Sequence, residues 1–277
     1  MTRARTLWSH FEPVHSVTYF APPVLAAFEE AGLRGFWRAY FASRAAPLGA
    51  TGPEPVLATF FGFAPVMVER AFPDVWQRTT PETALRVRRE ATAGVLRSLA
   101  PDAAYAEAAD LLDRAVAAAD LGGRPLAAYN AGLPRPDDDA ERLWLAATTL
   151  REHRGDGHIA VLVAQGLSPC ESLVLRGAID VPREVLQPVR GWTDEEWAAA
   201  EESLRARGWL DASGAATDAG RAAREEAERR TDELAERPWR SFSDAEVERV
   251  TELLRPVALG CLTLVPPQLP IALPRIG

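Results

Sequence analysis

The fold of this chain is decided by one stretch, Leu204-Arg205-Ala206-Arg207-Gly208-Trp209-Leu210-Asp211-Ala212-Ser213-Gly214-Ala215-Ala216-Thr217. Apolar residues recur at helical spacing on both sides of it, over Thr193–Gly208 and over Thr217–Ala235. Between these runs, a Trp-Leu pair is followed by Asp-x-Ser-Gly, a combination that favours a tight turn. The stretch therefore predicts two helices separated by a small β-hairpin.

Helical periodicity dominates the rest of the chain, and other strand signals are almost absent. The residues that stand where an N-cap is expected are Thr80, Asp102, Thr193, Thr217 and Ser243. Four prolines after Leu262 exclude a helix in the tail, which we expect to be an extended strap or a frayed end. The sequence predicts a mainly α protein. Its other expected helices are Val24–Ala31, Phe36–Ala46, Pro81–Ala100, Ala103–Asp120, Ala140–His153, His158–Gly166 and Ser243–Leu259.

The two parts of the chain resemble each other. Gly35–Pro47 aligns without gaps to Gly157–Pro169, an offset of 122. Further along, Arg86–Ala91 resembles Arg221–Glu226 at an offset of 135. The order of the matches is kept, which indicates an internal duplication. Because the offset rises, the first copy is about 13 residues shorter where a third helix and a hairpin would lie.

The duplication divides the chain into two halves, residues 1–133 and residues 140–277. The connection at Leu121–Asp139 contains Gly122-Gly123, three prolines and three consecutive aspartates. Such a composition predicts an exposed linker. The first half is a degenerate copy that is rich in aromatic residues, and the second half carries the predicted hairpin.

The second half resembles the winged helix-turn-helix regulators of the MarR-like family. The matching features are the run Leu204–Leu210 into the wing and Ala216–Gly220 at the start of the next helix. The whole chain also resembles an actinobacterial family of tandem MarR-like proteins with no assigned function. That likeness rests on His15–Phe20, Arg44–Gly49 and Leu150–His158. It implies a single-chain, monomeric pseudo-dimer whose halves meet through their first and last helices.

The net charge of the chain is −8, which disfavours general DNA binding. The helix that would read the major groove, Thr193–Arg207, carries five acidic residues against two arginines. In the first half the equivalent region is the apolar stretch Phe60–Met67, which has no side chain suited to reading bases. We therefore expect that DNA is not a partner of this chain.

A small-molecule pocket between the halves is the leading hypothesis, because polar and aromatic candidates fall near the expected seam. His15 and Tyr19 are four residues apart, so they share a face if their segment is helical. His153 and His158 bracket Arg154–Gly157, which we expect to form a tight turn between two helices. The polar candidates are His15, Tyr19, Arg44, Arg151, His153 and His158, with the two arginines able to hold an anionic group. The apolar candidates are Trp37, Tyr40, Phe41, Phe60, Phe61 and Phe63.

Two other functions stay open: a ligand-responsive transcriptional regulator whose second half touches DNA, and an enzyme that uses the His/Tyr cluster with haem or metal. The histidine spacing matches no zinc rule, so no metal ligands are assigned, and catalytic residues and cofactor stay unknown. No apolar run approaches the length of a membrane span, so no membrane contact is expected. No signal peptide is recognisable and no disulfide framework is expected, which favours the cytoplasm.

Overall fold

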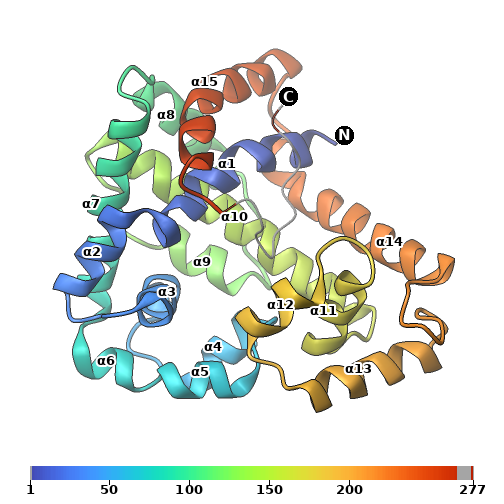
Figure 1. Cartoon of the computed structure of the whole chain (residues 1–277). Helices are drawn as coiled ribbons and strands as arrows, with labels where there is room; N and C mark the ends of the chain where they lie inside the picture. The colour runs from blue at the N-terminus through green and yellow to red at the C-terminus, as the bar shows by residue number, and fades with distance from the viewer. Residues whose placement is uncertain (1, 267–275, 277) are drawn as a thin grey trace.

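The computed structural model describes residues 2–266 and 276, and the tail that we expect to be a strap or frayed end lies mostly outside the described residues. The described chain is mainly helical, as predicted. Its longest helix, α10 (Asp139–Ala164), runs through the middle of the molecule (Figure 1). α10 packs against helices from both ends of the chain, so it forms the central support of the fold.

The residues before α10 form helices of very different length. The longest, α7, starts at Thr80, whose side chain accepts a hydrogen bond from the Thr83 amide as an N-cap. Short helices that begin at a proline occupy residues 53–71. These elements are α1 (Arg3–Phe20), α2 (Pro22–Glu30), α3 (Phe36–Ala45), α4 (Pro53–Thr59), α5 (Pro65–Ala71), α6 (Asp74–Arg78), α7 (Pro81–Leu99), α8 (Tyr105–Ala117) and α9 (Pro125–Ala131).

Most of the helices after α10 start at a side-chain cap. Ser168, Thr193 and Ser243 each form a capping box with a glutamate three residues later. Two of these caps, Thr193 and Ser243, were predicted from the sequence. The elements are α11 (Pro169–Gly177), α12 (Arg183–Arg190), α13 (Asp194–Ala206), α14 (Asp218–Ala235) and α15 (Asp244–Leu262).

Buried apolar side chains form two clusters. The larger one contains residues from α1 through α8, from the first part of α10 and from α15. Trp144 and Trp239 are among its fully buried members. The smaller one joins the end of α10 to α11, α13 and α14 around Trp197. The C-terminal helix α15 therefore packs beside the N-terminal helix α1 (Figure 1).

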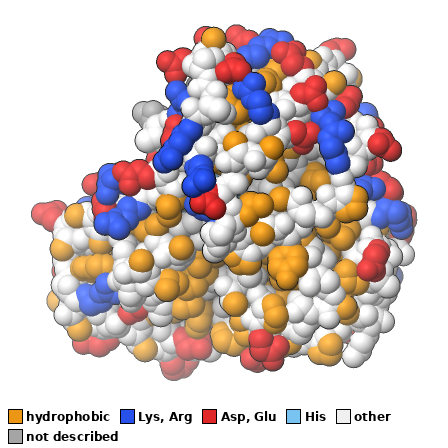
Figure 2. Space-filling view, turned by 180° about the vertical axis from the view of Figure 1, so that it is seen from behind, with side chains coloured by type: hydrophobic (Ala, Val, Ile, Leu, Met, Phe, Trp, Pro, Cys, Tyr) orange, Lys and Arg blue, Asp and Glu red, His pale blue; other side chains and the backbone are white. Residues whose placement is uncertain are grey.

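The surface is laced with ion pairs between helices. Seen from behind, arginine and acidic side chains lie side by side over the upper part of the molecule (Figure 2). One such pair joins Arg249 on α15 to Glu107 on α8, at 2.7 Å. Another joins Arg114 to Glu246 at 2.7 Å. Because these groups are exposed, each pair contributes at most about 1 kcal/mol to stability.

The tight turn expected at Arg154–Gly157 does not form, because α10 continues through it. The two glycines cost the helix about 1 kcal/mol each relative to alanine. They remain helical because of packing: the Arg124 guanidinium lies where a Cβ on Gly157 would be, 2.5 Å from its Nη1. Asp156 also accepts a hydrogen bond from the Ala127 amide at 2.9 Å. Gly157 therefore serves the close approach of Arg124, and the turn prediction was wrong.

The expected hairpin at residues 209–216 does not form a pair of strands. Leu210 and Ala216 make a single isolated antiparallel bridge, and no strand occurs among residues 2–266. The Asp211 carboxylate accepts from the Ser213 and Ala215 amides and closes the loop. Thr217 already caps α14, so the chain enters the helix before a strand can extend.

The expected exposed linker is partly built into the core. Within it, α9 packs along α10 and buries Leu126 and Ala127 completely. The segment expected to be an exposed linker therefore contains a packed helix. In the described part of the chain, no helix taken singly has the length and apolar character needed to cross a membrane; α10 and α11 meet those criteria only as a pair bent by 96°.

Candidate functional site

Two adjoining cavities lie where α1 and the Phe60–Phe63 segment face α10, α11 and α14. The larger, which we call the outer cleft, has a volume of about 850 Å³. The smaller, the inner pocket, has a volume of about 170 Å³. They share a wall made by five residues: Arg151, Gly155, His158, Arg176 and Arg224.

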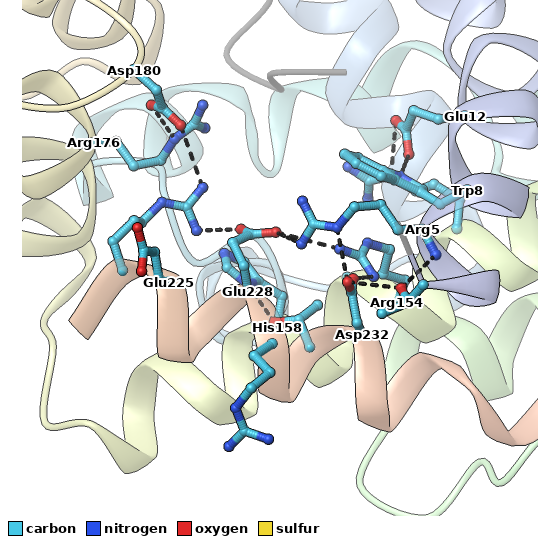
Figure 3. A pocket seen from close by; sticks show the side chains of 16 residues that line it. Arg5, Trp8, Glu12, Arg154, His158, Arg176, Asp180, Glu225, Glu228 and Asp232 are labelled. Atoms are coloured by element: carbon cyan, nitrogen blue, oxygen red, sulfur yellow. Dashed lines mark hydrogen bonds and ion pairs between the residues drawn. The ribbon is translucent and has the colours of Figure 1, made fainter. Parts of the chain in front are cut away.

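The outer cleft is lined by a lattice of arginines and acids. Arg5 of α1 pairs with Asp232 of α14 at 2.8 Å and with Glu228 at 2.6 Å. Arg154 of α10 reaches the same two acids, at 2.7 Å for Asp232 and 3.4 Å for Glu228. These four side chains meet across the cleft in Figure 3. The lattice ties α1, α10 and α14 together, and its guanidinium groups could also take a bound anion.

The two ends of the outer cleft have different character. At one end the guanidinium of Arg154 stacks on Trp8, with Cζ 4.5 Å from the ring centroid. The Trp8 indole donates to Glu12 at 2.7 Å. At the other end Arg176 pairs with Asp180 at 3.2 Å (Figure 3). An aromatic face at one end and ion pairs at the other suit a ligand with an apolar part and a polar part.

The inner pocket combines aromatic rings with guanidinium groups. Arg44 stacks on Phe60, with Cζ 4.2 Å from the ring centroid, and Arg190 stacks on Phe63 at 4.3 Å. The remaining apolar lining comes from Phe61 and from residues of α10 and α11, including Leu162 and Leu173. The lining includes no Asp or Glu and five arginines, which are Arg44, Arg151, Arg176, Arg190 and Arg224.

A buried ionic network lies behind the inner pocket. Glu152 of α10 accepts two hydrogen bonds from Arg44, at 2.9 and 3.0 Å, and one from Arg151 at 2.8 Å. Arg151 also contacts Glu12 of α1 at 3.4 Å. Although burial opposes ionisation, the two guanidinium groups hold the pKa of Glu152 well below its usual value. Glu152 is therefore charged at neutral pH and fixes both arginines in place.

His158 is the histidine that reaches the cavities. Its Nδ1 lies 2.9 Å from Thr231 Oγ1, and that hydroxyl donates its proton to the Ala227 carbonyl. Nδ1 must therefore be the donor to Thr231, which leaves Nε2 as a hydrogen-bond acceptor. Burial lowers the pKa of His158 to about 4, so the ring is neutral at physiological pH.

Half of the residues predicted from the sequence line the inner pocket. The polar ones are Arg44, Arg151 and His158, and the aromatic ones are Phe60, Phe61 and Phe63. They come from α3, from the segment after α4 and from α10. The folded chain thus brings together residues more than 100 positions apart in sequence.

The other predicted residues do not line either cavity. His15 is buried, bonds Thr148 through Nδ1 at 3.1 Å, and meets Tyr19 edge-on at 5.3 Å between centroids. Burial lowers the pKa of His15 and raises that of Tyr19. His153 lies buried near Arg124, away from the cavities. The remaining three form an aromatic cluster of the core: Trp37, Tyr40 and Phe41.

The sequence reasoning missed most of the arginines. Arg190 ends α12, a helix that is not among those expected from the sequence. Arg224 and Arg229 occur in a run of alternating charge on α14, which reads as a solvated face. No signal in the sequence distinguishes Arg224, which faces the cleft, from a surface arginine. Only the packing of α14 against α10 assigns its direction.

The outer surface of α13 is acidic. Glu195 and Glu202 are exposed, and Arg205 is engaged by Glu201 at 3.1 Å. Arg207 stacks on Trp209 at 3.8 Å and donates to the Gln165 carbonyl at 2.8 Å. Both arginines near the end of this helix are therefore occupied within the protein.

Within residues 2–266, His, Cys, Asp and Glu side chains form no group of three or more that could hold a metal ion. A family model described as a helix-turn-helix family matches residues 4–264, nearly the whole chain. No curated protein and no solved structure matches the chain.

Proposed function

Because the chain belongs to this helix-turn-helix family, we propose that it uses a regulator scaffold to bind a small molecule at the seam between its two halves. The observation that carries the proposal is the pair of adjoining cavities. Together they offer about 1000 Å³, enough for a drug-sized ligand, and they combine aromatic rings with a few placed polar groups. His158 supplies an acceptor and the arginines supply donors.

We further propose that the scaffold is a fused MarR-like pair, and a matched helix ending supports this. Gly32 and Gly166 both adopt positive φ after a helix, at +89° and +69°. The next residue in each case, Leu33 or Leu167, bonds back to the carbonyl five residues before it, at 2.9 and 3.1 Å. This correspondence has an offset of 134. An offset of 134 makes α3 equivalent to α11, whereas the offset of 122 makes α3 equivalent to the end of α10. We propose the offset of 134 in its place.

The packing of the terminal helices supports the same proposal. α1 and α10 cross each other, α1 packs on α15, and α10 packs on α8. With α1 equivalent to α10 and α8 to α15, the first helix of each half meets the last helix of the other. This reciprocity is what a two-fold interface requires.

We propose that the scaffold no longer binds DNA. The exposed face of α13 is acidic, and Arg205 and Arg207 are held by neighbouring groups. A polyanion that approaches this face meets like charge and releases few counterions, so its affinity would be low. A ligand-responsive regulator remains the second candidate, since family membership favours it.

The first experiment blocks the inner pocket. Ile159 of α10 lines that pocket, so an Ile159→Trp variant should fill it. Val163 lies one helical turn further on and is 57% exposed, so Val163→Trp is a matched control outside the lining. A panel of small molecules should raise the melting temperature of the wild type and of Val163→Trp but not that of Ile159→Trp. If no compound shifts the wild type, or if Ile159→Trp responds equally, the proposal is wrong.

The second experiment separates the two candidates. Mixed double-stranded DNA fragments are passed over immobilised protein at low and at physiological salt. The proposed loss of DNA binding predicts that DNA retained at low salt and released at physiological salt will not be observed. Salt-dependent retention that Glu195→Ala and Glu202→Ala leave unchanged or strengthen would favour the regulator instead.

A further inference from the structure

We infer that the inner pocket selects an organic anion with a flat apolar body, such as an aromatic carboxylate or sulfonate, and that Arg190 is its principal charged contact. This inference rests on the proposed binding role of the seam and specifies the ligand class. The ligand class follows from the lining of the cavities, in which arginines outnumber acidic residues.

The cavities are positive although the chain is negative overall. Together the outer cleft and inner pocket are lined by eight arginines and five acidic residues, a formal charge of +3, whereas the whole chain carries −8. All five acids line the outer cleft, and none lines the inner pocket. The inner pocket therefore has a local positive field enclosed by apolar walls, where charge interactions are least screened.

Four acids just outside the inner pocket hold most of its arginines. Glu152 and Glu12 hold Arg151, and Glu152 also holds Arg44. Asp180 pairs with Arg176 at 3.2 Å. Asp180 and Glu228 pair with Arg224. Each of these acids compensates the charge of the arginine that it contacts and orients its side chain. Four of the five arginines that line the inner pocket are compensated in this way.

Arg190 is the fifth arginine of the lining. Among the residues that the structure describes, Arg190 takes part in no ion pair with an Asp or Glu, and its buried Nε has no hydrogen-bond partner. Its guanidinium lies over Phe63, with Cζ 4.3 Å from the ring centroid, and the Tyr40 side chain is a further electrostatic neighbour. A guanidinium that is partly withdrawn from water and has no carboxylate partner is costly, and an anion in the pocket would relieve that cost.

The position of Arg190 is set by its backbone as well as its side chain. Its carbonyl accepts from the Ala64 amide at 2.9 Å, and the neighbouring Trp192 indole donates to the Gly62 carbonyl at 3.1 Å. These bonds clamp the end of α12 onto the Phe60–Phe63 segment. Since the surrounding walls are aromatic rings and leucines, the anion should carry a flat apolar body rather than be a bare inorganic ion.

The test uses a matched pair of fluorescent dyes, 1-anilinonaphthalene-8-sulfonate and its uncharged analogue N-phenyl-1-naphthylamine. Binding is measured by titration with the wild type, Arg190→Met, Arg190→Lys and the exposed control Arg240→Met. Near-ultraviolet circular dichroism confirms that each variant is folded. The wild type and Arg240→Met should bind the sulfonate at least about 10-fold more tightly than the neutral dye. Arg190→Met should lose that preference and Arg190→Lys should restore part of it.

The outcomes separate this inference from the proposed function. If the neutral dye binds as tightly as the sulfonate, or if Arg190→Met keeps the preference, the anion inference is overturned although the pocket still binds ligands. If neither dye binds saturably and Ile159→Trp changes nothing, the proposed function itself fails, and this inference fails with it. Retained sulfonate preference that depends on Arg190 and is blocked by Ile159→Trp supports both.

Discussion

Replacing Glu152 with glutamine should destabilise the protein strongly. Glu152 is almost fully buried at the centre of α10 and accepts three charge-assisted hydrogen bonds from Arg44 and Arg151. Glutamine keeps the shape but removes the negative charge and turns an NH₂ group towards a guanidinium. Arg151 retains Glu12 as a partner, whereas Arg44 loses the one carboxylate that it contacts among the described residues.

The magnitude follows from the burial of the pair. Breaking a buried ion pair from one side costs about 3–5 kcal/mol, because the remaining charge is uncompensated. We therefore expect Glu152→Gln and Arg44→Met each to lower the free energy of unfolding by roughly 3 kcal/mol. The double variant should lose less than the sum, with a coupling energy of about 1–3 kcal/mol. An exposed helical pair gives the control: Glu90→Gln, which faces Arg86, should cost no more than about 0.5 kcal/mol.

The assay is urea unfolding followed by tryptophan fluorescence, at several pH values. Because the folded-state pKa of Glu152 is depressed, its contribution is present above the unfolded value near 4.3 and is lost on further acidification. The wild type and Glu152→Gln should therefore differ at pH 7 and converge in acid. A loss below about 1 kcal/mol at pH 7, with an unchanged m-value, would refute the reasoning.

Two further predictions concern α10. Burial raises the pKa of Asp156 to about 7 in the folded protein, so this carboxyl favours folding while protonated and its contribution is lost as pH rises from about 4 through 7. The Asp156→Asn side chain can still accept a hydrogen bond from the Ala127 amide. Between pH 5 and pH 8, its free energy of unfolding in urea should rise by about 2–4 kcal/mol relative to that of the wild type. Parallel stability curves for the two proteins would contradict this prediction. Gly157→Ala should destabilise by about 1–3 kcal/mol because its Cβ would displace Arg124, whereas Gly94→Ala, in open space on α7, should stabilise by up to about 1 kcal/mol; equal effects in thermal melts would exclude the packing explanation.

Local chemistry made much of the fold predictable. The sequence predicts helix caps at five positions. Four of them, Thr80, Thr193, Thr217 and Ser243, accept the expected amide hydrogen bond. The prediction at Asp102 was wrong, because α8 begins after Ala104 and has no side-chain cap. Glycine was harder to interpret from sequence. Gly157 reads as a turn, but it lies inside a helix because Arg124 needs the space of its missing side chain. That requirement is set by a residue 33 positions away and leaves no local trace.

The candidate site shows the same division. Phe60, Phe61 and Phe63 could be named in advance because an aromatic run is unusual in an otherwise alanine- and arginine-rich chain. Tyr40 and Phe41 belong to the same aromatic group but pack into the core, and periodicity does not tell a pocket wall from a core face. The arginines were hidden for a different reason: with 31 of them and no lysine, a single arginine such as Arg190 carries no distinguishing signal.

The unbroken course of α10 has a mechanical consequence. Its 26 residues make a rod about 39 Å long that passes from one hydrophobic cluster to the other. A rod without a hinge does not bend, so any movement that widens the cavities has to come from an element packed against it, such as α14. A ligand that displaces α10 at His158 then also displaces Trp144, almost four turns away, because the helix rotates or slides as one stiff body.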